Sequence, residues 1–327
     1  MKLKILHLTN AFPYSGHPEY GCFIKSQIDS LDGLVESDVL FINAHSNGTL
    51  EYLKSLYKIR EKVKNADVIH CHHLFSFIAL KMSFSVRKPV VLSFLNDWTK
   101  EVKLNIPEVL KNILCSFFVE LPDKVIFKSF IPKFLKGNKF VFLPNGVDID
   151  FFNVINKDVA KFSLGLSKEK NYILFVSSKN LHRKQKRYDI YVKVLEHLQT
   201  NYPSYNYDTL TMSVDDRFTA RNKINSASLH LLCSDYEGSP NSVKEALSSG
   251  VPVVARPAGS VEQLLKNMPY SSMAYTEDYS KIAELVHNII CNDIDRESIR
   301  RKLLEQGIST AQVAIKLYEL YRELYEA

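Results

Sequence analysis

The residues with the clearest chemical potential form one short segment, Glu237-Gly-Ser-Pro-Asn-Ser-Val-Lys-Glu245. It lies between an apolar strand pattern at Leu229–Cys233 and a helical pattern at Ser242–Ser249. The start of a helix offers unpaired N–H groups and the positive end of the helix dipole, and both attract phosphate. We therefore predict a diphosphate site here, with Glu245 near enough to reach a ribose and Glu237 near enough to reach a sugar hydroxyl.

A capping box is the simpler explanation for part of this segment. Ser242 and Glu245 have the S-x-x-E spacing that would stabilise any helix by about 1 kcal/mol. That explanation leaves Glu237, the loop Gly238–Asn241 and the tight exit Ser249–Pro252 without a role. The ligand-binding interpretation covers them, and it assigns contacts to the following residues: Ser239, Pro240, Asn241, Ser242, Val243 and Glu245.

Two series of alternating strands and helices must position this segment. Continuous apolar strand runs that alternate with helices predict parallel sheets covered on both faces. The first series has strands at Leu3–Thr9, Asp38–Ile42, Asp67–Cys71, Val90–Phe94, Lys124–Phe127 and Phe140–Leu143, with helices near Phe23–Leu31, Leu50–Val63, Phe75–Ser85 and Glu108–Glu120. The second has strands near Tyr172–Val176, Leu210–Met212, Leu229–Cys233, Pro252–Ala255 and Met273–Tyr275, with helices near Asp189–Leu198, Ala220–Ser226, Ser242–Ser249, Val261–Leu265 and Tyr279–Cys291.

The turn residues Pro144-Asn145-Gly146 separate the two series and predict a link between domains. We predict an α/β fold of two Rossmann-like, doubly wound domains that face a cleft. The first covers residues 1–147 and the second covers 148–308. A last helix from Ser309, over 309–327, would pack back on the first domain. Ligands in such sheets bind outside the carboxyl ends of the strands.

Composition excludes several classes of protein. The 327 residues are 46% hydrophobic and 24% charged, as in an ordinary globular chain. There is no apolar run of about 18 residues and no signal peptide, so we predict a cytoplasmic protein. The five cysteines are scattered, which predicts buried free thiols without a disulfide framework or a zinc site. They are Cys22, Cys71, Cys115, Cys233 and Cys291.

The net charge of +6 is unevenly distributed, and residues 100–140 carry eight lysines against four acids. Six phenylalanines lie among them, so the stretch is either a basic face over a phenylalanine core or a surface that binds anionic lipid. Nucleic acid is not an expected partner, because no known binding motif accompanies the charge.

The chain resembles the retaining GT-B glycosyltransferases of family 4, the group 1 transferases, over nearly its whole length. Their hallmark is E-x7-E in a pattern like E-G-x-P-N-x-x-x-E-A, followed by G-x-P-V-V, and this chain matches it from Glu237 to Ala246 and from Gly250 to Val254. Weaker pieces follow in family order: Thr9–Pro13 with Tyr20–Phe23 as the first loop and helix, Pro144–Phe151 as the link, and Asn180–Asp189 as the basic loop. Bacterial enzymes of surface-polysaccharide assembly, including the teichuronic acid type, are the nearest in pattern.

The resemblance implies transfer of a hexose from a nucleoside diphosphate sugar with retained configuration, without metal or cofactor. UDP-sugars are the favoured donors, with GDP-mannose next, and the acceptor would be a glycan or a lipid-linked glycan at the inner membrane face. Glu237, Arg183 and Lys186 would be catalytic, the two cations stabilising the departing diphosphate. Lys179 and Arg187 are less certain members of the basic loop.

The resemblance also assigns residues of the first domain. The backbone at Gly21 would approach the phosphates, and His72, Asn96 and Asp97 would lie on the acceptor side. One departure concerns Leu95, which stands where many relatives carry a histidine and which cannot form a hydrogen bond. His70, His72 or His73 could take that role. A second departure is Lys179 or Asn180 in place of an arginine.

Three alternatives remain open. Asp148-Ile-Asp150 is a D-x-D triplet that could hold Mg²⁺ or Mn²⁺ in a metal-dependent transferase, although its place after Pro-Asn-Gly favours a linker. A non-catalytic protein that binds a nucleotide-sugar or a partner would turn nothing over. A related epimerase would form product without any acceptor. No spacing indicates a nucleophilic triad, a G-x-G-x-x-G loop or a P-loop.

Overall fold

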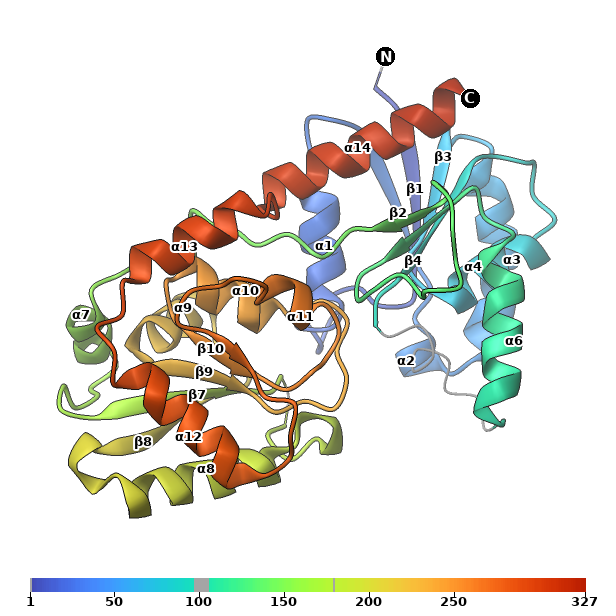
Figure 1. Cartoon of the computed structure of the whole chain (residues 1–327). Helices are drawn as coiled ribbons and strands as arrows, with labels where there is room; N and C mark the ends of the chain where they lie inside the picture. Colours follow the sequence, from blue (N-terminus) through green and yellow to red (C-terminus); the bar gives the residue numbers. More distant parts are fainter. Residues whose placement is uncertain (1, 97–105, 179) are drawn as a thin grey trace. The chain divides into compact units, whose positions relative to one another are not determined.

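The computed structural model describes residues 2–96, 106–178 and 180–327. They form two compact units, which are described separately (Figure 1). Unit 1 comprises Met1–Gly146 and Thr310–Ala327, and unit 2 comprises Val147–Ser309. The two ends of the chain therefore belong to the same unit.

Unit 1 contains a sheet of six parallel strands in the order β2-β1-β3-β4-β5-β6. Its strands are β1 (Lys4–Thr9), β2 (Glu36–Phe41), β3 (Val68–Cys71), β4 (Val90–Phe94), β5 (Lys124–Phe127) and β6 (Phe140–Phe142). Its helices are α1 (Cys22–Asp29), α2 (Ala44–Asn47), α3 (Leu50–Val63), α4 (Leu74–Met82), α6 (Glu108–Val119) and α14 (Thr310–Glu326). One sheet face packs against α3 and α4, and the other packs against α14.

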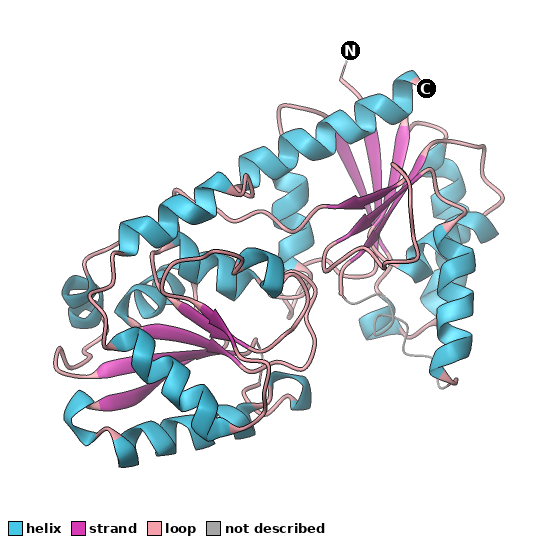
Figure 2. Cartoon of the chain, in the orientation of Figure 1, coloured by secondary structure: helices cyan, strands magenta, loops and turns pink. Residues whose placement is uncertain are grey.

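Unit 2 contains five parallel strands in the order β11-β10-β9-β7-β8. They are β7 (Asn171–Val176), β8 (Tyr207–Met212), β9 (Leu229–Leu232), β10 (Val253–Ala255) and β11 (Ser272–Met273). Helices α8 (Tyr188–Asn201) and α12 (Tyr279–Ile290) cover one face. The other face is covered by α9 (Arg217–Ser226), α10 (Asn241–Ser248), α11 (Val261–Leu264) and α13 (Arg296–Glu305). Figure 2 shows these helices on both sides of the strands, so the predicted α/β class is confirmed.

Capping side chains explain where several helices begin. Asp216 accepts hydrogen bonds from the N–H groups of Phe218 and Thr219, so α9 starts before the predicted Ala220. Helix α7 (Lys157–Ser163) and helix α13 were not predicted from the sequence, and Asn156 and Asp295 cap them in the same way. Short 3₁₀ turns, η1 (Lys184–Lys186) and η2 (Pro203–Tyr205), precede and follow α8.

Two expectations from composition are wrong in part. Cys71 and Cys233 are buried, but Cys22 and Cys291 are exposed. Among the phenylalanines of residues 106–140, Phe127 and Phe140 lie in the core, whereas Phe117, Phe130 and Phe134 are exposed. The phenylalanines are therefore not all core residues under a basic face. No helix in the described part of the chain is long and apolar enough to cross a membrane.

Candidate functional site

The predicted acidic loop and the predicted basic loop are joined in unit 2. The first follows β9 and the second follows β7, and these two strands are neighbours in the sheet, so their carboxyl ends meet. Gln185 in η1 donates its side-chain N–H to the carbonyl of Tyr236 at 2.6 Å, and the N–H of Asp235 donates to the carbonyl of Gln185 at 2.9 Å. The two loops thus form one assembly.

The central contact of this assembly is an ion pair. Lys186 Nζ donates to Glu237 Oε1 at 2.6 Å, and the two side chains are only 11% and 12% exposed. Attraction between opposite charges is stronger in such a partly dry site than in water. Two residues that the sequence assigned to catalysis therefore lie in direct contact at a strand's carboxyl end.

Arg183 lies next to this pair but faces solvent. Its guanidinium donates to the amide oxygen of Gln185 at 3.0 Å and to Ser178 Oγ at 3.3 Å. These oxygens are neutral, so the bonds hold the side chain without cancelling its charge. Lys179, in the same loop, lies outside the described residues.

Helix α10 begins as predicted beside this loop, but not through a capping box. Its N-cap is Pro240, and Ser242 Oγ instead donates to Nε2 of the buried His230 at 3.1 Å. The other ring nitrogen of His230 donates to the carbonyl of Leu174 at 3.0 Å, and burial lowers the pKa of this histidine to about 4. Pro240, at the N-cap position, makes no side-chain hydrogen bond to the first turn of α10. The simpler explanation of Ser242 and Glu245 therefore does not hold.

Two of the residues predicted to bind the ligand have roles of their own in the fold, and a third has an unmatched polar atom. The side chain of Val243 is wholly buried in the core, so it could offer only its backbone to a ligand. Ser239 accepts a hydrogen bond at 2.9 Å from Lys244, a fully buried residue that the sequence analysis did not single out. Asn241 Oδ1 is buried, and among the described residues it has no hydrogen-bond partner. An unmatched buried oxygen of this kind is costly unless a ligand or water satisfies it.

Glu245 is partly buried one turn into α10. Burial raises the pKa of its carboxyl group from 4.5 to about 7, and Lys244 and Arg217 oppose that rise only in part. The carboxyl group therefore changes its charge near neutral pH. A perturbed acid of this kind in a ligand loop is a common sign of a functional site.

Gly259, which was not predicted from the sequence, packs against the backbone of the loop that carries Glu237. Its φ is +61°, and a Cβ there would lie 2.1 Å from the carbonyl oxygen of Gly238 and 2.7 Å from that of Glu237. The N–H of Ser260 donates to the carbonyl of Gly238 at 2.9 Å. Only glycine allows this close approach, so Gly259 fixes the position of the loop that carries Glu237. Its sequence signal was Gly-Ser before a short helical pattern.

Arg187 is part of a separate ion-pair network. It contacts Asp189, Asp235 and Glu277, and Arg256 contacts the last two at 2.8 and 2.6 Å. These carboxylates raise the pKa of the Arg187 guanidinium above its ordinary value, so it stays charged. Its role is to hold the loop base rather than to present a free cation.

The candidates of the first domain all belong to unit 1. Gly21 caps α1 with φ +68°, and a Cβ there would lie 2.3 Å from the carbonyl carbon of Ala11, so loop packing already requires glycine. His72 is fully buried at the end of β3. Asn96 follows β4 and is exposed, and Asp97 lies outside the described residues. The Glu237 loop, in contrast, belongs to unit 2.

The D-x-D alternative receives no support from its contacts. Asp148 accepts a hydrogen bond from Arg217 at 2.7 Å and another from the N–H of Phe151 at 3.1 Å. Both bonds stabilise the start of unit 2, as expected for linker residues. Asp150 is exposed beside them.

Comparison with known proteins gives a likeness in fold alone. No family model and no curated protein matches the chain. Solved structures do match it over almost its whole length. Sucrose-phosphate synthase from Thermosynechococcus elongatus has a TM-score of 0.77 at 12% identity, covering 99% of this chain and 100% of that one. HepE of Anabaena, in complex with UDP and glucose, has a TM-score of 0.72 at 14% identity, covering 98% and 100%.

A glycosyltransferase from Rickettsia africae has a TM-score of 0.70 at 16% identity, covering 99% of this chain and 98% of that one. With two parallel α/β sheets and these neighbours, the chain has the GT-B fold. At such low identity the likeness defines the architecture, and the activity must be argued from the residues.

Proposed function

We propose that this protein is a retaining glycosyltransferase that moves a hexose from a nucleoside diphosphate sugar to a glycan or lipid-linked acceptor. The observation that carries the proposal is the Lys186–Glu237 pair at the carboxyl end of the unit 2 sheet. It places a cation and an acid side by side on a fold shared with glycosyltransferases. Parallel sheets bind their ligands at this edge.

The roles follow from the charges that develop during transfer. The departing diphosphate gains negative charge, which Lys186 and the exposed Arg183 would stabilise together with the uncapped N–H groups of α10. Glu237 would bind a hydroxyl of the transferred sugar, and Glu245 would bind the ribose. Attack on the same face by the acceptor, with the leaving phosphate as base, would retain the configuration, and no metal or cofactor takes part.

UDP is the nucleotide we favour. HepE, one of the structural neighbours, has been solved with UDP and with UDP-glucose. Family membership in group 4, and a product in bacterial surface polysaccharide such as the teichuronic type, are further parts of the proposal. They rest on the motif from Glu237 to Ala246 and not on the fold.

We also propose peripheral contact with the inner face of the membrane, from the cytoplasm. Helix α6 exposes a continuous apolar stripe at spacings of three and four residues: Val109, Leu110, Ile113, Leu114 and Phe117, between 37% and 71% exposed. Lys133, Lys136 and Lys139 follow in the same segment of unit 1. An apolar helix face with nearby lysines suits the interface of an anionic bilayer.

Donor binding and slow donor hydrolysis test the proposal. UDP-, GDP-, ADP- and CMP-sugars are compared in EDTA, with Glu237→Gln and Lys186→Met, and with Lys184→Met as the matched control from the same turn. We expect one donor, a UDP-sugar, to be hydrolysed by the parent chain and by the control but not by the two variants. Binding without any turnover, even with glycan acceptors present, would favour a non-catalytic protein. An epimerised sugar formed from donor alone, in place of the simple hydrolysis product, would favour an epimerase, and no binding would refute the site.

A further inference from the structure

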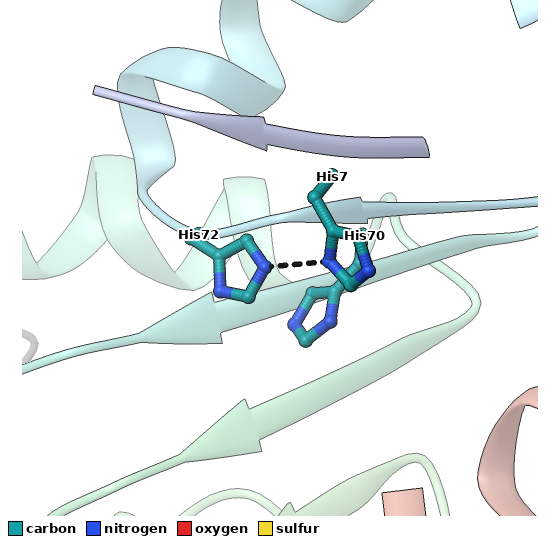
Figure 3. A group of neighbouring side chains, drawn as sticks. All are labelled: His7, His70 and His72. Atoms are coloured by element: carbon teal, nitrogen blue, oxygen red, sulfur yellow. Dashed lines mark hydrogen bonds between the residues drawn. The ribbon is translucent and has the colours of Figure 1, made fainter. Parts of the chain in front are cut away.

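A second group of residues that could bind a ligand lies in unit 1, whereas the Glu237 loop belongs to unit 2. His7 on β1 and His70 on β3 are register partners in the sheet, and His72 lies two residues beyond His70. Side chains two residues apart on a strand share one face, so the three rings gather on the same face. All three side chains are fully buried. Figure 3 shows the three rings close together, with a dashed line joining His7 and His72.

The ring nitrogens are near enough to share one ion. His7 Nδ1 and His72 Nε2 are 3.0 Å apart, and one potential ligand atom from each of the three rings lies within 4.8 Å of the others. Two nitrogens bound to one tetrahedral zinc are about 3.4 Å apart, given bond lengths of about 2.1 Å. The first pair therefore needs to separate by a few tenths of an ångström, and His70, whose ligand atom lies within 4.8 Å of the others, needs to approach by up to about 1.4 Å.

Hydrogen bonding within the protein leaves this group incomplete. His7 Nε2 and His72 Nδ1 are buried, and neither has a partner among the described residues. With two neutral rings joined by one N–H···N bond, one of these two atoms carries an unmatched hydrogen and the other an unmatched lone pair. Either is unfavourable in a dry interior. Two ring nitrogens of the group therefore remain able to bind a further partner among or beyond the described residues.

His70 already has the outer partners that orient a metal ligand. One of its nitrogens contacts Tyr321 at 2.6 Å and the other contacts Ser93 Oγ at 2.7 Å. If one nitrogen bound a metal, the other would keep its hydroxyl partner. Ligand histidines in proteins usually have such a second partner on the far nitrogen.

We propose that His7, His70 and His72 bind one divalent transition metal ion, with Zn²⁺ the best fit. Three imidazoles are a donor set that zinc accepts, and a small fourth ligand such as water would complete the tetrahedron. The ion would join β1 to β3 and, through Tyr321, to α14. Its role would be structural, so it stands apart from the metal-free transfer chemistry proposed above.

One neighbouring group opposes a cation. Lys128, fully buried after β5, donates to Gln27 Oε1 at 3.1 Å and lies near enough to His70 and His72 to affect their charge. If the site binds a cation, removal of this ammonium group should strengthen binding. Lys128→Met keeps the length of the side chain. It should strengthen metal binding, whereas removal of a ligand histidine should weaken it.

The experiment measures metal in the purified full-length protein. The chain is incubated with Zn²⁺ or Co²⁺, excess ion is removed by gel filtration, and the bound metal is counted by mass spectrometry. Visible absorption of Co²⁺ reports a tetrahedral site. We expect one equivalent to be retained, the thermal midpoint to rise by several degrees, and Lys128→Met to bind at least as tightly. His72→Gln and His7→Gln should lose the equivalent, while the control His197→Gln, at a partly buried histidine of unit 2, keeps it.

Two results would overturn the proposal. One is a folded parent chain, verified by circular dichroism, that retains no metal and shows no tetrahedral Co²⁺ spectrum. The other is a folded His72→Gln variant that still retains one equivalent. If both histidine variants fail to fold, the decision rests on the parent chain and on Lys128→Met. None of these measurements involves a nucleotide-sugar, so they are independent of the proposed activity.

Discussion

The ammonium group of Lys186 lies 2.6 Å from a carboxylate oxygen of Glu237, although 51 residues separate them in the chain. The pairing depends on the order of the sheet, because β7 and β9 are neighbours while β8 lies at the edge. A cation that an acidic side chain holds in place is already oriented, so it needs little reorganisation when it meets a diphosphate.

The first prediction concerns this pair. Lys186→Met and Glu237→Gln should each lower the turnover of the donor by about 10²–10³-fold, because each removes a charge that stabilises the transition state. The double variant should lose much less than the product of the two effects, since the residues act together. Steady-state kinetics of all three variants measure this, with Lys184→Met expected near the parent rate. Fully multiplicative losses would contradict a coupled role.

The second prediction concerns the ionisation of Glu245. Its pKa is raised from 4.5 to about 7, so the folded protein holds more protons than the unfolded chain between these values. The contribution of Glu245 to the free energy of unfolding should therefore be greatest below about pH 4.5. It should fall as the pH rises to about 7. The loss amounts to about 3–4 kcal/mol at most, since each pKa unit corresponds to about 1.36 kcal/mol.

Glu245→Gln should remove this dependence. At pH 8 the variant should melt higher than the parent by about 4–8 °C, and at pH 5 the two should nearly coincide. Thermal unfolding followed by circular dichroism at both pH values is the measurement. Glu297→Gln, on the exposed first turn of α13, is the matched control and should change little at either pH. An unchanged difference at both pH values would argue against a buried acid.

The third prediction concerns the glycine behind the loop. Gly259→Ala should cost about 1–2 kcal/mol for the left-handed backbone alone, and the collision with the Gly238 carbonyl should displace the loop. Donor turnover of the folded variant should then fall by more than the loss of folded protein accounts for. Gly165→Ala is the control, because it has a similar φ of +65° but open space around its Cβ. It should lose stability to a similar extent and keep its turnover.

The fourth prediction concerns the apolar stripe of α6. Ile113→Ser with Phe117→Ser should reduce sedimentation with anionic lipid vesicles by about tenfold, because two large apolar groups no longer enter the interface. High salt should weaken binding of the parent chain as well. Phe162→Ser, which removes an even more exposed phenylalanine from unit 2 (83% against 62% for Phe117), should bind like the parent. Equal binding by the double variant and this control would exclude the stripe as the contact.

Much of the fold could be predicted because its strands are continuous apolar runs. The β9 strand and the α10 helix lie within a residue or two of their expected ends, since burial on both faces leaves a strong pattern. Helix α13 was missed because its sequence, Arg296–Glu305, is mostly charged and is stabilised by a cap and by packing of Ile299 and Leu303.

The sequence named the residues of the candidate site more easily than their partners. Ser242 was expected either to cap α10 or to contact a ligand, but its hydroxyl bonds the buried His230, twelve residues earlier in the chain. His7 drew no attention because its closeness to His70 depends on which strands pair, and local pattern does not specify that. Side-chain contacts across a sheet follow from topology, and a single sequence contains little information about it.

Unit 1 is built from both ends of the chain, and this affects the order in which the protein can be made. The hydroxyl that contacts His70 belongs to Tyr321, which is synthesised 251 residues later. At about 5–20 residues per second, that is a delay of roughly 10–50 s. Throughout this delay the sheet face that α14 will cover lacks its helix, whereas unit 2 has all its strands once β11 ends at Met273, before α14 is made. The first domain to emerge from the ribosome is therefore the last to be completed.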